Sequence, residues 1–234
     1  MRLAIMQPYF LPYIGYFQLM QAVDTFVLYD NIKYTKKGWI NRNRFLRNGK
    51  DAVFSVPLRS ASDSLDIRDR QVAADFDREK LLNQFLGAYR NAPFFTQTFK
   101  LIEQVVHHEN TNLFGYLCHS IRLTCEYLGI VVDFRTSSNV NIDHALKGQD
   151  KVLAMCTALD ASTYVNPPGG IGLYSSKAFR ERNIELRFIR PQVCEYSQFD
   201  HEFVPWLSIV DVMMFNSVDA IRTRILPRFE LVQG

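Results

Sequence analysis

Polar and aromatic side chains follow two short apolar runs near the start of the chain, where they are placed to bind a ligand. Gln7 and Tyr9 follow Arg-Leu-Ala-Ile-Met, and Asp30 follows Thr-Phe-Val-Leu-Tyr. An amide donates and accepts hydrogen bonds, and a tyrosine offers a hydroxyl and a stacking face. A carboxylate after a strand can bind a ribose hydroxyl or another polar group. We therefore predict a binding site here. The alternatives are a structural turn with packed aromatics and an Asx turn at Asp30.

The segment from 31 to 50 is basic, in contrast to the nearly neutral chain as a whole. Arginine side chains pair bidentately with phosphate or carboxylate, and lysines act as point charges. The segment therefore predicts a phosphate-bearing ligand, bound by Lys33, Lys36, Asn41, Arg42 and Arg44. A solvated loop is the alternative. A nucleic-acid surface, with Tyr34 and Trp39 for stacking, is a third interpretation.

A glycine-rich segment later in the chain adds further candidates for ligand binding. It reads Asn-Pro-Pro-Gly-Gly-Ile-Gly-Leu-Tyr from residue 166. Glycine lets the backbone approach a ligand closely, so Gly169, Gly170 and the following Tyr174 are predicted to bind substrate. The segment matches neither the Walker motif nor GxGxxG, and a tight turn is the alternative.

Asp211 and Asn216 stand out because the segment from 205 to 216 is otherwise apolar. A buried aspartate needs a partner. Asp211 is therefore expected either to form a structural ion pair with a basic side chain or to face a site, where it is a second catalytic candidate beside Asp30. Asn216 is a substrate-binding candidate at the end of the same segment.

Several other kinds of site are not expected. The four cysteines and five histidines form no CxxC or HExxH motif, and no GxSxG occurs. A metal site and a nucleophile elbow are therefore not predicted, and the cysteines are expected to be reduced. No cofactor is evident, although ATP or Mg²⁺ would be compatible with the sequence. With 27 basic and 24 acidic residues, the net charge of +3 does not indicate nucleic-acid binding.

The elements that must position these side chains begin with a βαβ unit. Residues 2–6 and 24–29 are apolar runs with the lengths of strands, and residues 15–23 have apolar side chains at helical spacing. Residues 7–13 contain two prolines, so they form a stiff loop between the first strand and the helix. A strand, a helix and a second strand in this order predict a parallel pair with a right-handed crossover.

The rest of the chain continues the alternation, so we predict an α/β fold with a mostly parallel sheet, the N-terminal βαβ unit and flanking helices. Residues 71–128 are predicted to be mainly helical and could form a helical insertion or subdomain within a single domain of residues 1–234. Residues 59–70 are expected to be an exposed loop. Further strands are expected at 52–57, 130–134, 163–165 and 185–189, and helices at 147–159, 175–182 and 207–216.

The chain is expected to be cytoplasmic and to lack a membrane span. No apolar run reaches the length that a membrane-spanning helix needs. Pro8 and Pro12 interrupt the apolar N-terminus, and no cleavage site follows, so a signal peptide is not expected. The oligomeric state cannot be inferred from the sequence.

Motifs along nearly the whole chain resemble the WbqC-like protein family. The most specific is Ile5-Met-Gln-Pro-Tyr-Phe-Leu-Pro-Tyr-Ile-Gly-Tyr-Phe, followed by Ala22-Val-Asp, Tyr29-Asp, Lys36 and Asn41-Arg-Asn-Arg. Leu128-Gly-Ile, Ser137-Ser, the Gly169-Gly segment and Leu207-Ser-Ile-Val-Asp-Val-Met-Met-Phe-Asn fit the same family. The chain departs from the family pattern at Asn166-Pro-Pro, where Ser-Gly is more usual, and at Ser217, which replaces a glycine.

The resemblance implies a function in the assembly of O-antigen and other surface polysaccharides, because members look associated with the aminoacylation of amino sugars. The expected activity is an acyl- or aminoacyl-transferase, for example a glycyl transferase, acting on the amine of a nucleotide-linked sugar. Asp30 or Asp211 would be its base or orient the amine, and the basic side chains would hold phosphate. The donor stays open among an adenylate, a carrier-protein thioester and an aminoacyl-tRNA.

Two alternatives stay open beside a transferase. One is a non-catalytic binding or scaffolding protein of a biosynthetic complex. The other is an ATP-dependent adenylating enzyme, because the strand, loop, helix and strand are similar to those of adenylyl-transferring α/β folds. Both histidines of the HxGH motif in those folds are absent here.

Overall fold

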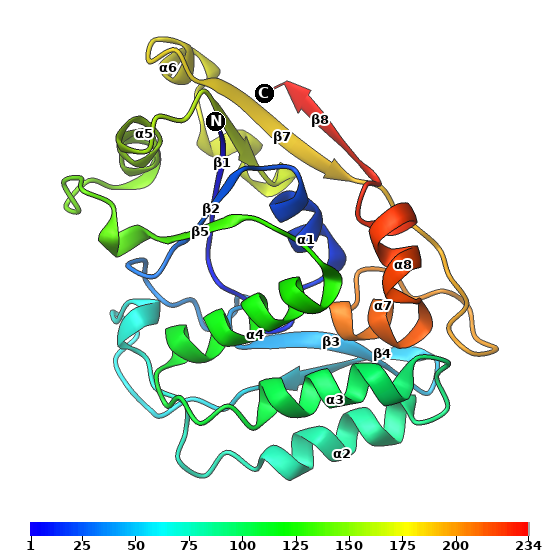
Figure 1. Ribbon diagram of the computed structural model, residues 1–234. Helices are drawn as coiled ribbons and strands as arrows, with labels where there is room; N and C mark the ends of the chain where they lie inside the picture. The colour runs from blue at the N-terminus through cyan, green and yellow to red at the C-terminus, as the bar shows by residue number, and fades with distance from the viewer. Residues whose placement is uncertain (234) are drawn as a thin grey trace.

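A six-stranded sheet forms the centre of the protein in the computed structural model, which describes residues 1–233 (Figure 1). The strands lie in the order β5-β2-β1-β6-β7-β8. The first five are parallel and β8 is antiparallel to β7. Their bounds are β1 (Arg2–Met6), β2 (Thr25–Leu28), β5 (Asp133–Thr136), β6 (Thr163–Asn166), β7 (Glu185–Pro191) and β8 (Phe229–Gln233). The predicted α/β class with a mostly parallel sheet is confirmed.

The predicted N-terminal βαβ unit is also confirmed. Helix α1 (Ile14–Gln21) connects β1 to β2, and the two strands pair in parallel from Leu3 opposite Thr25 to Met6 opposite Leu28. Both strands are buried on both faces, as a parallel sheet covered by helices on its two sides requires.

Helices cover the sheet on both sides, and each side has its own hydrophobic core. Helices α1 and α4 (Leu113–Leu128) pack on one face, where Phe17 and Ile121 share a core with Phe26 of β2. Helices α5 (Gly148–Ala158) and α6 (Ser176–Arg180) pack on the other face, where Val152 and Phe179 share a core with Val27. This arrangement places the carboxyl ends of the parallel strands along one edge.

A separate antiparallel hairpin, β3 (Arg42–Arg47) and β4 (Lys50–Ser55), lies between the large sheet and the helices α2 (Arg78–Tyr89) and α3 (Phe95–Val106) (Figure 1). Its turn is Asn48-Gly49, with φ of 52° and 72°, the combination that a two-residue hairpin turn favours. Phe54 packs edge-on against Phe85 of α2 at 5.0 Å between ring centroids. The hairpin therefore joins the helices of residues 71–128 to the same core that contains α1.

Several predicted elements differ from the structure. The strand expected at 52–57 is β4, and its partner β3 occupies part of the basic segment that was expected to bind phosphate. Residues 59–70 are not wholly exposed, because Ile67 and Arg70 are buried around a short 3₁₀ turn. The strand expected at 130–134 begins at Asp133.

Regular secondary structure continues beyond the helix that was expected at 207–216. That helix is α7 (Ile209–Phe215), and it is followed by α8 (Val218–Ala220), a π-helical turn at Ile221–Ile225 and the edge strand β8. Within residues 1–233, no helix has the length and apolar character needed to cross a membrane.

Two glycines in helical segments should respond in opposite ways to alanine. Gly129 ends α4 in the left-handed conformation, with φ of 67°, whereas Gly87 lies inside α2 with open space around it. We expect Gly129→Ala to lower the free energy of unfolding by about 1 kcal/mol, because a Cβ disfavours this backbone conformation. We expect the control Gly87→Ala to raise it by up to about 1 kcal/mol, because alanine is the better helix former. Urea denaturation of both variants measures this, and shifts in the same direction would contradict the assignment.

Candidate functional site

The chain adds strands on opposite sides of the β1–β6 pair, so the sheet has a topological switch point between these two strands. In open α/β sheets, ligands bind in the crevice at such a point. From β1 the chain continues to β2 on one side, and from β6 it continues to β7 on the other. Gln7 follows β1 and Asn166 ends β6, so both stand at this edge. Gln7 is half-buried, and its backbone carbonyl accepts a hydrogen bond from Tyr16 Oη at 2.9 Å.

A cleft of about 430 Å³ opens beside this point, and we call it the aromatic cleft. Its walls come from the loop after β1, the hairpin, the ends of β6 and β7, and the loop before α7. It is lined by Tyr9, Pro12, Tyr13, Trp39, Asn43, Arg44, Pro168, Arg190, Pro191 and Trp206. Both tryptophans are 42% exposed. The volume lies in the range of small-molecule sites, and the lining is largely apolar with a few polar groups, as such sites require.

Buried hydrogen bonds to the carbonyl oxygen of Leu11 hold the cleft in shape. This oxygen accepts from Asn43 Nδ2 at 2.9 Å and from Ser208 Oγ at 2.7 Å. Leu11 has a φ of 43° and Trp206 a φ of 60°, both in the left-handed region that non-glycine residues rarely occupy. Such strain clusters at binding and catalytic sites, where the surrounding structure has to maintain it.

Two arginines supply the charge of the aromatic cleft. Arg44 donates to Asp51 and to the backbone carbonyl of Trp206, both at 3.2 Å, and its guanidinium lies 5.7 Å from the ring centre of Trp39. Arg190 is exposed and forms no ion pair among residues 1–233. The cleft therefore combines aromatic faces with one fixed arginine and one that is available to an anionic ligand.

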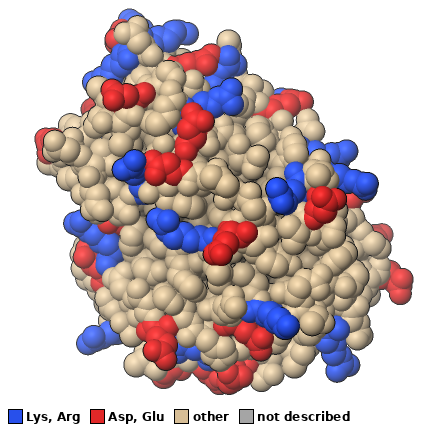
Figure 2. All heavy atoms as spheres, viewed as in Figure 1, with Lys and Arg blue, Asp and Glu red and all other residues tan. Residues whose placement is uncertain are grey.

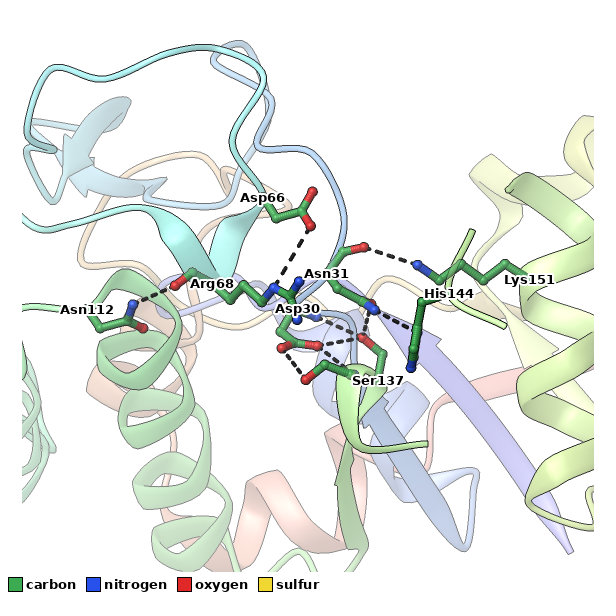
Figure 3. Close-up of polar contacts among 9 residues, drawn as sticks. Asp30, Asn31, Asp66, Arg68, Asn112, Ser137, His144 and Lys151 are labelled. Carbon is green, nitrogen blue, oxygen red and sulfur yellow. Dashed lines mark hydrogen bonds and ion pairs between the residues drawn. The ribbon is translucent and has the colours of Figure 1, made fainter. Parts of the chain in front are cut away.

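Asp30 lies on the other side of β1, where it joins the end of β2 to the end of β5 (Figure 3). The side chain is buried. One carboxylate oxygen accepts from Ser137 Oγ at 2.7 Å and from the backbone N–H of Ser138 at 2.9 Å, and the other accepts from Ser138 Oγ at 2.7 Å. Asp30 therefore fixes the turn after β5.

The same network extends from Asn31 to His144. Ser137 Oγ also lies 2.7 Å from Asn31 Oδ1, and its one hydrogen is shared between Asp30 and Asn31; Asn31 Nδ2 lies 2.9 Å from His144 Nδ1. Lys151, from α5, donates to the backbone carbonyl of Asn31 at 3.3 Å. The sequence analysis did not single out Ser137, His144 or Lys151 as site residues. Lys151 could have been found from the sequence, because it is a lysine on the apolar face of a predicted helix.

The glycine-rich segment packs against the end of β6. A Cβ on Gly170 would collide with the side-chain amide nitrogen of Asn166 and come within 3.2 Å of the Tyr174 ring, so a larger residue here would have to displace the Asn166 side chain. Gly169 has open space around it. Tyr174 contacts Tyr164 edge-on at 5.6 Å. Burial, together with nearby Tyr174 and Asp66, raises the pKa of Tyr29 to about 12, so its hydroxyl stays protonated at neutral pH.

The predicted phosphate ligands do not converge on one point. Arg44 lines the aromatic cleft, whereas Arg42 donates to the backbone carbonyls of Lys37 and Gly38. Lys36 forms an exposed ion pair with Asp63 at 2.9 Å. Asn41 bonds with Tyr34 and with the carbonyl of Val56, and Lys33 forms a backbone bridge with Asp66. Acidic and basic side chains are interspersed on the face in Figure 2.

Asp211 is fully buried in α7 and forms no ion pair within residues 1–233. Its oxygens accept from Tyr89 Oη at 2.9 Å, Tyr196 Oη at 2.7 Å and Gln198 Nε2 at 2.6 Å. The expected ion pair is wrong, because all three side-chain donors are neutral. Burial raises the pKa of the Asp211 carboxyl to about 6. The three hydrogen bonds act in the opposite direction and lower this pKa, but burial has the larger effect. Asp211 and Asp30 have no hydrogen-bond partner in common. Asn216 caps α7 by donating to the carbonyl of Val212 and lines a different pocket.

Tyr89→Phe should destabilise the protein by about 2–3 kcal/mol near neutral pH, because it leaves Asp211 and the backbone N–H of Leu46 each short of a buried partner. The folded pKa of Asp211 is raised, so its proton binds more tightly in the folded protein. This contribution to stability is fully present below the unfolded pKa and is lost as the pH rises through about 6.

The lost hydrogen bond favours the ionised carboxylate, so the cost of Tyr89→Phe should be smaller near pH 5 than near pH 8. Urea denaturation at both pH values measures it. Tyr127→Phe is the control, since that hydroxyl makes no hydrogen bond within residues 1–233. Equal losses for the two variants would show that Tyr89 does not support Asp211.

Comparison with known proteins agrees with the motifs of this site. The WbqC-like protein family matches residues 7–223, which includes the loop after β1, the hairpin, the Asp30 network and α7. The chain is also similar to the uncharacterized protein Rv1507c of Mycobacterium tuberculosis, with 26% identity over 218 residues, covering 92% of this chain and 93% of that protein. No solved structure matches the chain. The chain belongs to the WbqC-like protein family.

Proposed function

We propose that this protein is an acyl- or aminoacyl-transferase that forms an amide on the amine of a nucleotide-linked amino sugar, in the biosynthesis of a surface polysaccharide such as O-antigen. The observation that carries the proposal is the aromatic cleft beside the switch point of the sheet. Membership of the WbqC-like family supports it, because the resemblance implies an association with the aminoacylation of amino sugars.

The chemistry of the cleft suits the two parts of a sugar nucleotide. Trp39, Trp206 and Tyr9 offer faces on which a base or the apolar face of a sugar can stack. Arg44 and Arg190 offer guanidinium groups to a diphosphate. Gln7 Nε2 makes no hydrogen bond within residues 1–233, so it is free to bind a sugar substituent at the edge between the cleft and Asp30.

Amide formation requires the amine to lose a proton as its nitrogen attacks an activated carbonyl carbon. The new C–N bond replaces the bond from that carbon to a phosphate, a thiol or a tRNA hydroxyl. Both carboxylates are buried and hydrogen-bonded. We assign Asp30 rather than Asp211 to the group that orients the amine or receives the proton, through Ser138 Oγ, which donates to Asp30 at 2.7 Å, because Asp30 follows β2 at the ligand-binding edge. Asp211 is enclosed by Tyr89 and its neighbours within the core.

A scaffolding function is the second candidate. The glycine-rich segment after β6 exposes Ile171 and Leu173, at 55% and 69% of their surfaces. Exposed apolar side chains next to a cleft fit a surface that contacts another protein, including an acyl-carrier protein. In that case the cleft would bind a ligand that regulates assembly.

The two tryptophans of the chain both line the aromatic cleft, so intrinsic fluorescence reports on its occupancy. We expect UDP- or dTDP-linked amino sugars to change the fluorescence, and the matching hydroxy sugars to bind more weakly because they lack the amine. Trp39→Phe and Trp206→Phe each leave one reporter. Arg190→Ala should weaken binding about tenfold or more, since a charge-assisted contact to phosphate is lost.

Arg180→Ala is the matched control, because this exposed arginine lies on α6, outside the cleft lining. Unchanged fluorescence with every sugar nucleotide, or equal affinity of Arg190→Ala and the wild-type protein, would exclude the cleft as the sugar-nucleotide site. A response to ATP with Mg²⁺ alone would favour the adenylating enzyme instead.

A further inference from the structure

Lys151 is a buried lysine for which residues 1–233 provide almost no partner. It lies in the first turns of α5 and exposes only 5% of its surface. Its ammonium nitrogen makes one hydrogen bond, at 3.3 Å to the backbone carbonyl of Asn31 (Figure 3). The same nitrogen lies 5.3 Å from the ring centre of Tyr29. No carboxylate forms an ion pair with it among the described residues.

Three physical effects act against a positive charge at this position. Burial removes the ammonium from water, and it lowers the pKa of Lys151. The amino-terminal end of α5 carries the positive end of the helix dipole. Two of the three ammonium N–H groups make no hydrogen bond within the described chain. A buried charge in such a place is costly unless an anion completes its surroundings.

Arg68 is the second cation of this region. Its side chain is 47% exposed and approaches Asp66 only at 4.0 Å. Figure 3 shows Arg68 and Lys151 pointing toward Asn31 from opposite sides. Asp66 and Asp30 attract the ammonium of Lys151 electrostatically, but neither forms an ion pair with it among the described residues, and Asp66 is paired with Arg68. The oxygens of Asp30 are already engaged by Ser137 and Ser138.

We infer that Lys151 and Arg68 form an oxyanion-binding subsite at the carboxyl ends of β2 and β5, which takes a phosphoryl or carboxylate group. Lys151 supplies two unused N–H donors, and Arg68 supplies a planar guanidinium that can approach the same anion from solvent. The subsite lies across β1 from the aromatic cleft.

The identity of the anion rests on the proposed function. If the aromatic cleft holds the sugar nucleotide, the anion belongs to the acyl donor. It would then be the phosphate of an activated acyl group or the carboxylate of a free amino acid. β1 runs between the two subsites, and the N–H of Tyr29, which follows β2, donates to the carbonyl of Met6 in β1 at 2.8 Å.

Lys151→Met tests the subsite without any sugar nucleotide. The experiment measures Tm with inorganic phosphate and with acetate, each against chloride at the same ionic strength. An anion that binds the folded state raises Tm. We expect phosphate, acetate or both to raise Tm of the wild-type protein, and Lys151→Met to weaken this binding about tenfold or more. Lys147→Met, at an exposed position just before α5, should respond to the anions like the wild-type protein.

The Tm in chloride is a second readout, and it distinguishes an anion-binding lysine from one whose function is purely structural. Methionine replaces an uncompensated charge with an apolar chain of similar length, so Lys151→Met should be as stable as the wild-type protein or more stable without the anion. A response to phosphate alone identifies a phosphoryl group, and a response to acetate alone identifies a carboxylate.

Two outcomes would overturn the subsite. One is a marked fall in Tm of Lys151→Met in chloride, which would mean that the ammonium is already satisfied by the protein. The other is that phosphate and acetate change the Tm of the wild-type protein and of Lys151→Met equally, or change neither. Neither outcome depends on whether sugar nucleotides bind the aromatic cleft.

Discussion

The carbonyl oxygen of Leu11 is the point at which three distant segments of the chain meet. Asn43 of β3 and Ser208 before α7 both donate to it, while the backbone N–H of Ile209 donates to the carbonyl of Pro12. Both donor side chains are buried, so these hydrogen bonds are not exchanged for bonds to water. The strained backbone at Leu11 is maintained by this arrangement, which helps to fix the hairpin and α7 relative to the loop after β1.

Under the proposed function, fixing these segments makes the carboxyl edge of the sheet a site with two candidate subsites. The aromatic cleft lies on the side of β6 and β7, and the Asp30 network with Lys151 lies on the side of β2 and β5. β1 runs between them and ends at Gln7. A reaction that joins two substrates needs such neighbouring subsites, because holding both partners in place lowers the entropic cost of their meeting.

The sequence predicted the elements whose residues carry strong periodic patterns, including β1, α1, β2 and the helices of residues 71–128. It did not predict β3, because arginines at alternate positions read as a basic loop, although Asn43 and Phe45 between them are buried. For the candidate site, Gln7, Tyr9 and Asp30 were predicted from their places after strands, and their functions stay predictions. Lys151, Arg190 and Trp206 were not, because only the packing of α5, β7 and the loop before α7 brings them to this edge.

The most direct test of this account is amide hydrogen exchange of the protein with and without a nucleotide-linked amino sugar. The account predicts slower exchange in residues 7–13, 39–44 and 204–208, which form the walls of the aromatic cleft and meet at the Leu11 carbonyl. Exchange there should slow because a ligand that bridges these walls suppresses their local opening. Protection confined to the surfaces of α2, α3 and α4, or no protection in these three segments, would contradict it.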